Sequence, residues 1–291
     1  MKDFITLQNR NITSNDINFI RQLIANNPAW GRTQLSRELC KLWNWQAHNG
    51  QLKDMACRTL LLKLNKLNLI SLPKKLIASG SKKTKRIIPF IPHDTSIIEG
   101  NLNSLGTIRI ENIQDKKALP LFNCLLSKYH YLGYSGSVGE NMKYIVFDQI
   151  HRPLACLLFG SAAWKIAPRD SFIGWNSLTQ KQNLFLITNN MRFLILPWVL
   201  VPNLASFILS KIASRISTDW TNKYNHPISL LETFVDRSRF FGTCYKAANW
   251  LLVGQSKGRS RNDTFNSIRV PVKDIYLFPL SKNFKEVLNH E

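Results

Sequence analysis

The sequence has few acidic residues for its length, and it lacks the short pattern that would identify a nucleotide-hydrolysing enzyme. Among its 291 residues, 18 Asp and Glu stand against 39 Lys and Arg, which gives a formal net charge of +21. No stretch follows the phosphate-loop pattern GxxxxGK[ST], so nucleotide hydrolysis is not indicated. The shortage of acid instead predicts a polyanionic partner such as nucleic acid.

Cysteine pairs and long apolar runs are also missing. The five cysteines are scattered and never form a CxxC pair, which predicts free thiols rather than disulfides or a zinc site. The longest apolar stretch, residues 192–203, is about half the roughly 20 residues of a membrane-spanning helix and contains two prolines. No apolar segment follows a basic start in the first thirty residues. We therefore expect a cytoplasmic protein without a membrane partner.

What is present is the composition of a globular protein, with 44% hydrophobic and 11% aromatic residues. The composition changes along the chain and predicts three segments: a helical domain over 1–73, a linker over 74–104 and a mixed α/β domain over 105–291. Residues 1–100 hold 16 basic and 6 acidic side chains, and the remaining 191 hold 23 and 12. The net charge is therefore +10 over the first 100 residues and +11 over the other 191, which is nearly twice as much positive charge per residue in the first third.

Apolar residues at helical spacing predict three helices in the first domain. The first is capped by Thr13–Asp16 and buries Ile17, Ile20, Leu23 and Ile24. The second runs from Thr33 with Leu35, Leu39 and Leu42 inward, and the third starts near Lys53 with Met55, Leu60, Leu61, Leu64 and Leu67 inward. An extended segment, Leu69–Leu72, follows.

Three helices followed by an extended segment are typical of a winged helix-turn-helix, whose third helix enters the major groove of DNA. Basic side chains follow the exposed faces of the second and third helices. We expect six of them to contact DNA: Arg32, Arg37, Lys53, Arg58, Lys63 and Lys66. The alternative is a merely solvated basic face.

The linker is polar, contains prolines and carries a second basic cluster. Its basic residues are Lys82, Lys83, Lys85 and Arg86, followed by Pro89 and Pro92. Such a segment can lie along a phosphate backbone, or it can be a solvated connection between domains.

The pattern of apolar runs in the second domain predicts a meander of strands followed by a strand, a helix and a strand. Two apolar runs, Lys143–Phe147 and Pro153–Phe159, flank a polar connector and predict a hairpin. A strand over Met191–Leu196, a helix from Leu204 and a strand over Ile228–Val235 complete the order. With the aromatic segment Tyr245–Trp250, this order resembles the GNAT acyltransferase fold. Such folds bind a cofactor pyrophosphate at a glycine-rich turn, but the equivalent turn here, Pro202–Ser206, contains no glycine.

The densest polar stretch of the second domain contains four candidate catalytic residues: Glu232, Asp236, Arg237 and Tyr245. A Glu and an Asp on one face of a strand can act as an acid–base pair or bind a divalent metal, with the arginine and tyrosine positioning a phosphate. The alternative is an internal ion pair between one of these carboxylates and an arginine. Cys244 has no evident base nearby in sequence, so a nucleophilic role is not predicted.

Further residues of this domain are candidates for contact with nucleic acid. Tyr131 lies in a glycine- and tyrosine-rich loop over residues 129–140, where a ring can stack on a base, and the neighbouring His130 reads as a structural histidine. The basic candidates are Arg239, Lys257, Arg259 and Arg261.

Several long stretches, spread over nearly the whole chain, together resemble the Druantia DruA family. They are Asn27–Trp30 with Arg32, Leu35–Arg37, Trp43–Trp45, Leu52–Arg58, Tyr129–Gly133, Phe159–Trp164, Leu230–Asp236 and Gly242–Trp250. The resemblance implies a component of a multi-gene bacterial anti-phage system, in a family also met beside or fused to transposases. It supplies no catalytic residues.

Three hypotheses follow. The first is a DNA-binding defence protein without a cofactor, which contacts DNA and other proteins of its system. The second is a metal-dependent enzyme acting on DNA through Glu232 and Asp236. The third is an acyltransferase, or a non-catalytic descendant that serves as an assembly subunit.

Overall fold

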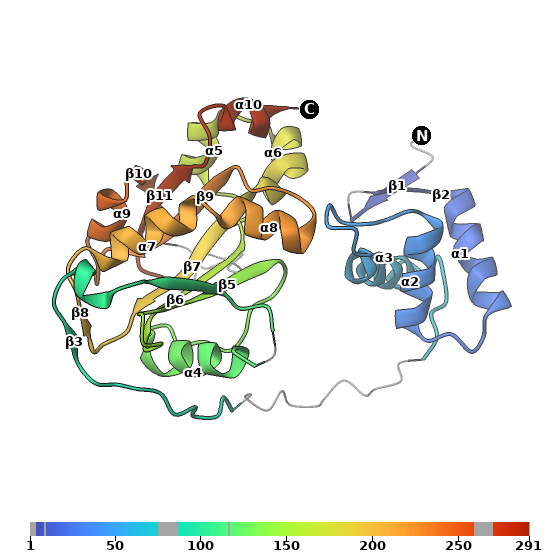
Figure 1. Cartoon of the computed structure of the whole chain (residues 1–291). Coiled ribbons are helices and arrows are strands. Elements are labelled where there is room, and N and C mark those ends of the chain that lie inside the picture. The colour runs from blue at the N-terminus through green and yellow to red at the C-terminus, as the bar shows by residue number, and fades with distance from the viewer. Residues whose placement is uncertain (1–3, 9, 75–86, 116, 259–269, 291) are drawn as a thin grey trace. The chain divides into compact units, whose positions relative to one another are not determined.

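The computed structural model describes residues 4–8, 10–74, 87–115, 117–258 and 270–290 (Figure 1). The chain divides into two compact units, Met1–Lys85 and Arg86–Glu291. Six candidate residues for contact with nucleic acid lie outside the described residues: Lys82, Lys83, Lys85, Arg86, Arg259 and Arg261.

The first unit is an antiparallel hairpin followed by three helices. The hairpin joins β1 (Phe4–Leu7) to β2 (Arg10–Thr13), and the helices are α1 (Ser14–Asn26), α2 (Arg32–Leu42) and α3 (Asp54–Lys66). The three predicted helices are therefore confirmed. The N-cap prediction also holds, because the Thr13 side chain accepts from the Asp16 amide while the Asp16 carboxylate accepts from the Thr13 amide.

The core of this unit is built from the predicted apolar faces, with three exceptions. Ile20, Leu39 and Leu60 are fully buried in one cluster. Leu42, Met55 and Leu67, expected to point inward, are 58%, 65% and 52% exposed. All three stand in the first or last turn of a helix or just beyond it, where the helix extends past its packing partners.

The extended segment after α3 is not a strand, so the expected wing is not found at Leu69–Leu72. Side chains occupy its backbone groups instead. Arg21 Nε donates to the Leu69 carbonyl at 2.8 Å, Asn65 Oδ1 accepts from the Leu72 amide at 2.9 Å, and Arg32 Nε donates to the Pro73 carbonyl at 2.7 Å. These three hydrogen bonds hold the segment against the helices, and Ile70 packs in the helical core. The hairpin of this unit precedes α1, a feature that the sequence analysis missed.

The second unit is built on a seven-stranded sheet in the order β10-β11-β9-β7-β6-β5-β4. Its strands are β4 (Arg109–Asn112), β5 (Asn141–Phe147), β6 (Pro153–Ser161), β7 (Ile187–Ile195), β9 (Leu230–Asp236), β10 (Leu251–Gln255) and β11 (Lys273–Pro279). All neighbours are antiparallel except β7 and β9. The predicted hairpin is confirmed as β5–β6, and the predicted order of meander, strand, helix and strand is the order observed.

A short parallel pair lies outside this sheet. In it β3 (Ile98–Glu99) pairs with β8 (Val199–Leu200). Residues 98–104, expected in a linker, therefore belong to the second unit, which starts earlier than Leu105. The reason is that Ile98 is an apolar residue buried in the core of that unit.

Helices cover both faces of the large sheet. Figure 1 shows α7 (Leu204–Ala213) and α8 (Ile216–Tyr224) over one face and α4 (Leu119–Tyr129) at the other. The helix expected from Leu204 through Ile216 is divided into two at Ser214 and Arg215. The remaining helical segments are η1 (Leu102–Leu105), α5 (Ala167–Ile173), α6 (Ser177–Asn183), η2 (Leu184–Leu186), α9 (Thr243–Ala247) and α10 (Phe284–Asn289). None of the helices in the described ranges is both long and apolar enough to cross a membrane.

Candidate functional site

The two parallel strands of the sheet separate partway along their length and leave a cavity between them. Pairing of β7 with β9 runs from Ile187–Leu230 to Asn190–Thr233 and then stops. Beyond that point both strands continue and line a cavity of about 560 Å³. The loop after α4 and the segment from Arg239 to Tyr245 complete its wall. Strands that part in this way expose backbone and side chains that a closed sheet would cover.

Tyr245, a predicted site residue, lies in this cavity. Its hydroxyl donates to Asn190 Oδ1 at 3.3 Å, and the Thr233 hydroxyl oxygen lies 3.4 Å from the tyrosine oxygen. The side chain is buried, and this burial raises the pKa of the Tyr245 hydroxyl. The hydroxyl therefore stays protonated and acts as a hydrogen-bond donor at the point where the strands separate.

Aromatic and cationic side chains form the mouth of the cavity. The guanidinium of Arg239 lies 5.1 Å from the ring centre of Tyr131, and the Phe240 ring meets Tyr131 edge-on at 5.4 Å. Arg192 also lines the cavity, and it donates to the Gly133 carbonyl at 3.2 Å. Two predicted nucleic-acid-binding residues, Tyr131 and Arg239, are thus in contact although they are distant in sequence.

Asp236 is the one predicted carboxylate that lines the cavity. Hydrogen bonds from the Ser238 hydroxyl at 2.7 Å and the Ser238 amide at 3.0 Å hold it in place. The bond from the Ser238 side chain lowers the pKa of Asp236, and the nearby charges of Lys273 and Arg239 act in the same direction. Asp236 is therefore ionised and compensated by neighbouring cations.

Glu232 is not part of the cavity, which corrects its expected role as a metal ligand or acid–base group. The carboxylate is fully buried and accepts from Arg169 Nη1 at 2.8 Å and from the Ala163 amide at 2.8 Å. Arg169 is also fully buried. The arrangement is the internal ion pair that the sequence analysis left open, and it leaves Glu232 inaccessible to a substrate.

Arg237 also departs from the expected site. Its side chain is 55% exposed and forms an ion pair with Asp274 at 3.5 Å instead of lining the cavity. Cys244 does line the cavity, but burial raises its pKa to about 11, so it stays a thiol. Among the described residues, no group of three or more His, Cys, Asp or Glu side chains is arranged to hold a metal ion.

The predicted basic face of the first unit is divided between two kinds of side chain. Arg32 is occupied by the Pro73 carbonyl, and Arg58 pairs with Asp54 at 3.0 Å. Four other cations are exposed and form no ion pair within the described residues: Arg37, Lys53, Lys63 and Lys66. These four present charge to solvent on α2, on α3 and at the start of α3. In the second unit, Lys257 is exposed as well.

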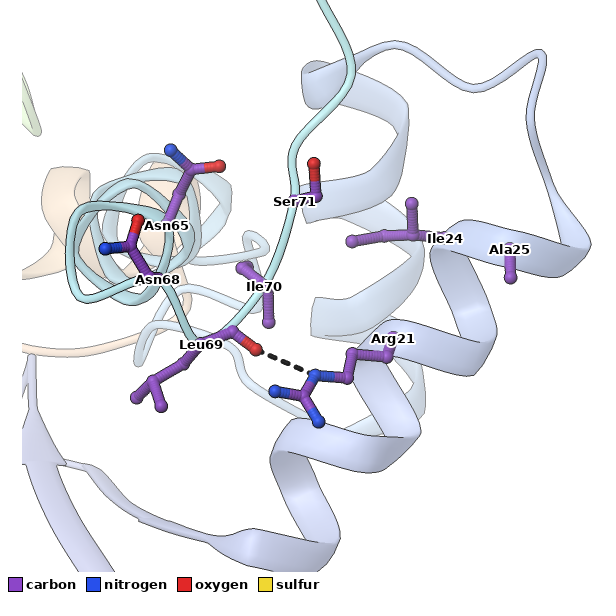
Figure 2. A pocket seen from close by; sticks show the side chains of 8 residues that line it. All are labelled: Arg21, Ile24, Ala25, Asn65, Asn68, Leu69, Ile70 and Ser71. Carbon is purple, nitrogen blue, oxygen red and sulfur yellow. Dashed lines mark hydrogen bonds between the residues drawn. The ribbon is translucent and has the colours of Figure 1, made fainter.

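A separate pocket of about 630 Å³ lies in the first unit between the second half of α1 and the segment after α3. Figure 2 shows Arg21 reaching from α1 to the Leu69 carbonyl, with Asn65 and Asn68 at the end of α3. Two of its polar side chains bond to the protein's own backbone: Arg21 donates to the Leu69 carbonyl, and Asn65 accepts from the Leu72 amide. We therefore interpret the pocket as a structural contact between α1 and the segment after α3.

Asn190, Arg192 and Phe240 are among the cavity residues that were missed from the sequence. The signal for the first two was present. Asn190 lies beside the apolar run that was predicted to be a buried strand, and Arg192 lies within it, in what is now β7. A polar or charged side chain at such a place needs a hydrogen-bond partner. Phe240 and the adjacent Phe241 gave no such signal, because aromatic residues in a loop usually pack against the protein's own core.

The family model for Druantia protein DruA matches residues 63–270 of the chain. The chain belongs to this family. No curated protein sequence matches the chain.

Solved structures similar to this chain include spermidine N-acetyltransferases of Vibrio cholerae. One, in complex with manganese ions, has 9% identity and a TM-score of 0.39 and aligns over 62% of this chain and 98% of its own. Another, in complex with CoA and spermine, has 8% identity and a TM-score of 0.40 over 60% and 96%. A dodecameric form has 8% identity and a TM-score of 0.39 over 60% and 95%.

Proposed function

We propose that this chain is a nucleic-acid-binding component of a Druantia-type anti-phage defence system. The observation that carries the proposal is the cavity mouth, where Arg239 lies over the Tyr131 ring and Phe240 packs against its edge. A cation beside exposed rings is the combination that single-stranded nucleic-acid sites use, since the cation meets phosphate and the rings meet bases.

Charge supports the same function. The chain carries +21, and the exposed Arg37, Lys63 and Lys66 have no carboxylate partner within the described residues. Unpaired cations gain more from meeting phosphate than paired ones, because no internal ion pair has to be broken. The first unit thus offers a second basic surface, and DNA is the polyanion we propose for both.

Metal-dependent cleavage of DNA receives less support. Glu232 and Asp236, the expected pair, lie in different environments. Glu232 is paired with Arg169 in the core, and only Asp236 lines the cavity. A single compensated carboxylate is a poor site for a divalent cation, which prefers several oxygen ligands. We accordingly propose a binding role in the cytoplasm, beside other proteins of the system.

Fluorescence anisotropy with labelled DNA at increasing salt tests the proposal. With roughly four phosphates neutralised, affinity should fall on the order of a hundredfold between about 50 and about 200 mM salt. Replacing Arg239 with Ala should weaken binding at every salt concentration, whereas the exposed Glu286→Gln change should not. Absence of DNA binding at low salt would refute the proposed function.

One observation favours a second candidate, an acyltransferase-derived subunit. Two parallel strands separate after Asn190 and Thr233, and the cavity between them, with Tyr245 in its wall, can receive a ligand. Against it, the Pro202–Ser206 turn has no glycine, and Asn203 holds a left-handed φ of +63° there. Calorimetric titration with acetyl-CoA tests this candidate, and no heat of binding would remove its catalytic form.

A further inference from the structure

The inner end of the cavity contains a buried polar group without a partner. Asn190 is 4% exposed and lines the cavity where the β7–β9 pairing ends. Its Oδ1 accepts from Tyr245, but its Nδ2 has no hydrogen-bond partner within the described residues. Nine buried side-chain polar atoms of the described residues have no hydrogen-bond partner, and Asn190 Nδ2 is the one whose residue lines this cavity. A ligand in the cavity can therefore supply the acceptor that this donor lacks.

The Asn190 amide is held in one orientation by its neighbours. Tyr245 donates to its oxygen, and the Thr233 hydroxyl donates to the Asn190 carbonyl at 3.1 Å. Because the side-chain oxygen and the backbone carbonyl of Asn190 both accept hydrogen bonds, the N–H groups of its side-chain amide are held in one orientation relative to the cavity. A fixed donor at the end of a cavity selects ligands that present a carbonyl oxygen or a ring nitrogen.

The outer end of the cavity is a platform of rings. Tyr131, Phe240 and Phe241 are 40%, 48% and 83% exposed, although large aromatic side chains are usually well buried. Tyr131 and Phe240 touch each other, and Arg239 covers the Tyr131 ring. Flat rings at the entrance favour a flat ligand, and the adjacent cations favour one attached to an anion.

We infer that the cavity receives a single unstacked nucleobase of a DNA strand, with its ring against Tyr131 and Phe240 and an acceptor of its edge facing Asn190. This inference rests on the proposed function and deepens it. The volume of about 560 Å³ lies within the range of about 300–1,000 Å³ usual for small-ligand sites and accommodates a base together with its sugar.

A base inside a duplex is stacked and paired, so it must be extruded before it can enter such a cavity. This extrusion costs energy for a duplex and little for a single strand. The site therefore predicts a preference for single-stranded DNA or unpaired ends. The phosphate attached to the base would lie at the mouth, beside Arg239 and Arg192.

The test compares two oligonucleotides with the same phosphates: single-stranded DNA, and the same length made entirely of abasic sites. The full chain should bind the normal strand about tenfold more tightly, because one stacked base typically contributes about this factor. Tyr131→Ala should abolish the difference, and Tyr131→Phe should retain it. Asn190→Asp should reduce it, since the change keeps the shape and removes the amide donors.

Controls keep this inference separate from the proposed function. Trp164→Ala removes a ring that is 52% exposed and lies outside the cavity wall, so it should leave the difference intact. Equal affinity for normal and abasic strands would overturn the inference and leave nucleic-acid binding in place. No binding of either strand would refute the proposed function itself. The inference would also be overturned if acetyl-CoA bound in the cavity while normal and abasic strands bound with equal affinity. Thermal melting of each variant establishes that it is folded.

Discussion

Arg169 and Glu232 form a fully buried ion pair, with Nη1 and Oε2 2.8 Å apart. Arg169 also bonds to the Ala163 carbonyl at 2.7 Å and to Asp170 Oδ1, while Glu232 accepts from the Ala163 amide. The pair thereby ties α5 and the segment after β6 to the middle of β9. Two residues 63 positions apart form the polar centre of the second unit.

Breaking this pair should destabilise the fold rather than abolish a reaction. Glu232→Gln should lower the free energy of unfolding by about 3 kcal/mol, because it leaves Arg169 charged in the core with one carboxylate fewer. Urea denaturation measures the change, with the surface variant Glu286→Gln expected within about 0.5 kcal/mol of the parent. Unchanged stability together with loss of a DNA-directed activity would restore the catalytic reading of Glu232.

The backbone beside the cavity requires glycine at position 242. Its φ is +68°, and an added Cβ would lie 2.5 Å from the buried Tyr276 hydroxyl. Gly242→Ala should therefore destabilise the second unit by about 3 kcal/mol. Gly174 supplies the control, because its φ is +82° but no atom lies within 4 Å of the added Cβ. Gly174→Ala should cost only about 1 kcal/mol, and equal losses for both would argue against the steric conflict.

Salt dependence should identify which lysines of the first unit meet phosphate. Replacing Lys63 and Lys66 together with Ala should reduce the slope of log affinity against log salt by about 2, since each phosphate contact contributes about 1. Lys41 is a matched control, because it is already paired with Glu38 at 2.9 Å. A slope that falls by about 1 for Lys41→Ala, as much as for each of the two lysines, would show that general charge, not this face, determines binding.

The histidine at the cavity should make stability depend on pH. Burial lowers the pKa of His130 to about 4, and the charge of Arg192 acts in the same direction. The Leu132 amide donates to its Nδ1 at 3.2 Å, which requires a neutral ring. Since the unfolded histidine has a pKa of about 6.5, the unfolded chain binds more protons between these values. Stability should thus fall as the pH is lowered from about 6.5 to about 4.

The difference between the parent and His130→Gln isolates this effect from other titrating groups. Unfolding free energies measured at several pH values should fall less steeply for His130→Gln than for the parent. Parallel curves for the parent and the His130 variant would contradict the assignment.

Local patterns were sufficient for the three helices of the first unit and for β5, β6, β7 and β9 of the sheet, but they did not indicate β4, β10, β11 or the helix α4. The Thr13 capping box, the period of Ile17 and Ile20, and the two apolar runs around residues 148–152 act over a few residues and are visible in sequence. The hairpin before α1 was not, because its strands of four residues each are shorter than the usual alternating signal. The same limit applies to β3, whose partner strand among the described residues is β8, about 100 residues later.

The sequence by itself determined the charge, the helices of the first unit, the chain order of β5, β6, β7 and β9, and the family resemblance. Only the tertiary structure decided which polar residues share a site. It placed Tyr131, Asp236, Arg239 and Tyr245 around one cavity, directed Arg237 to Asp274, and placed Glu232 in the core with Arg169. The physical reason is that the environment of a carboxylate depends on its neighbours: Asp236 is held by Ser238 two residues later, whereas Glu232 is buried against Arg169, 63 positions away in the sequence.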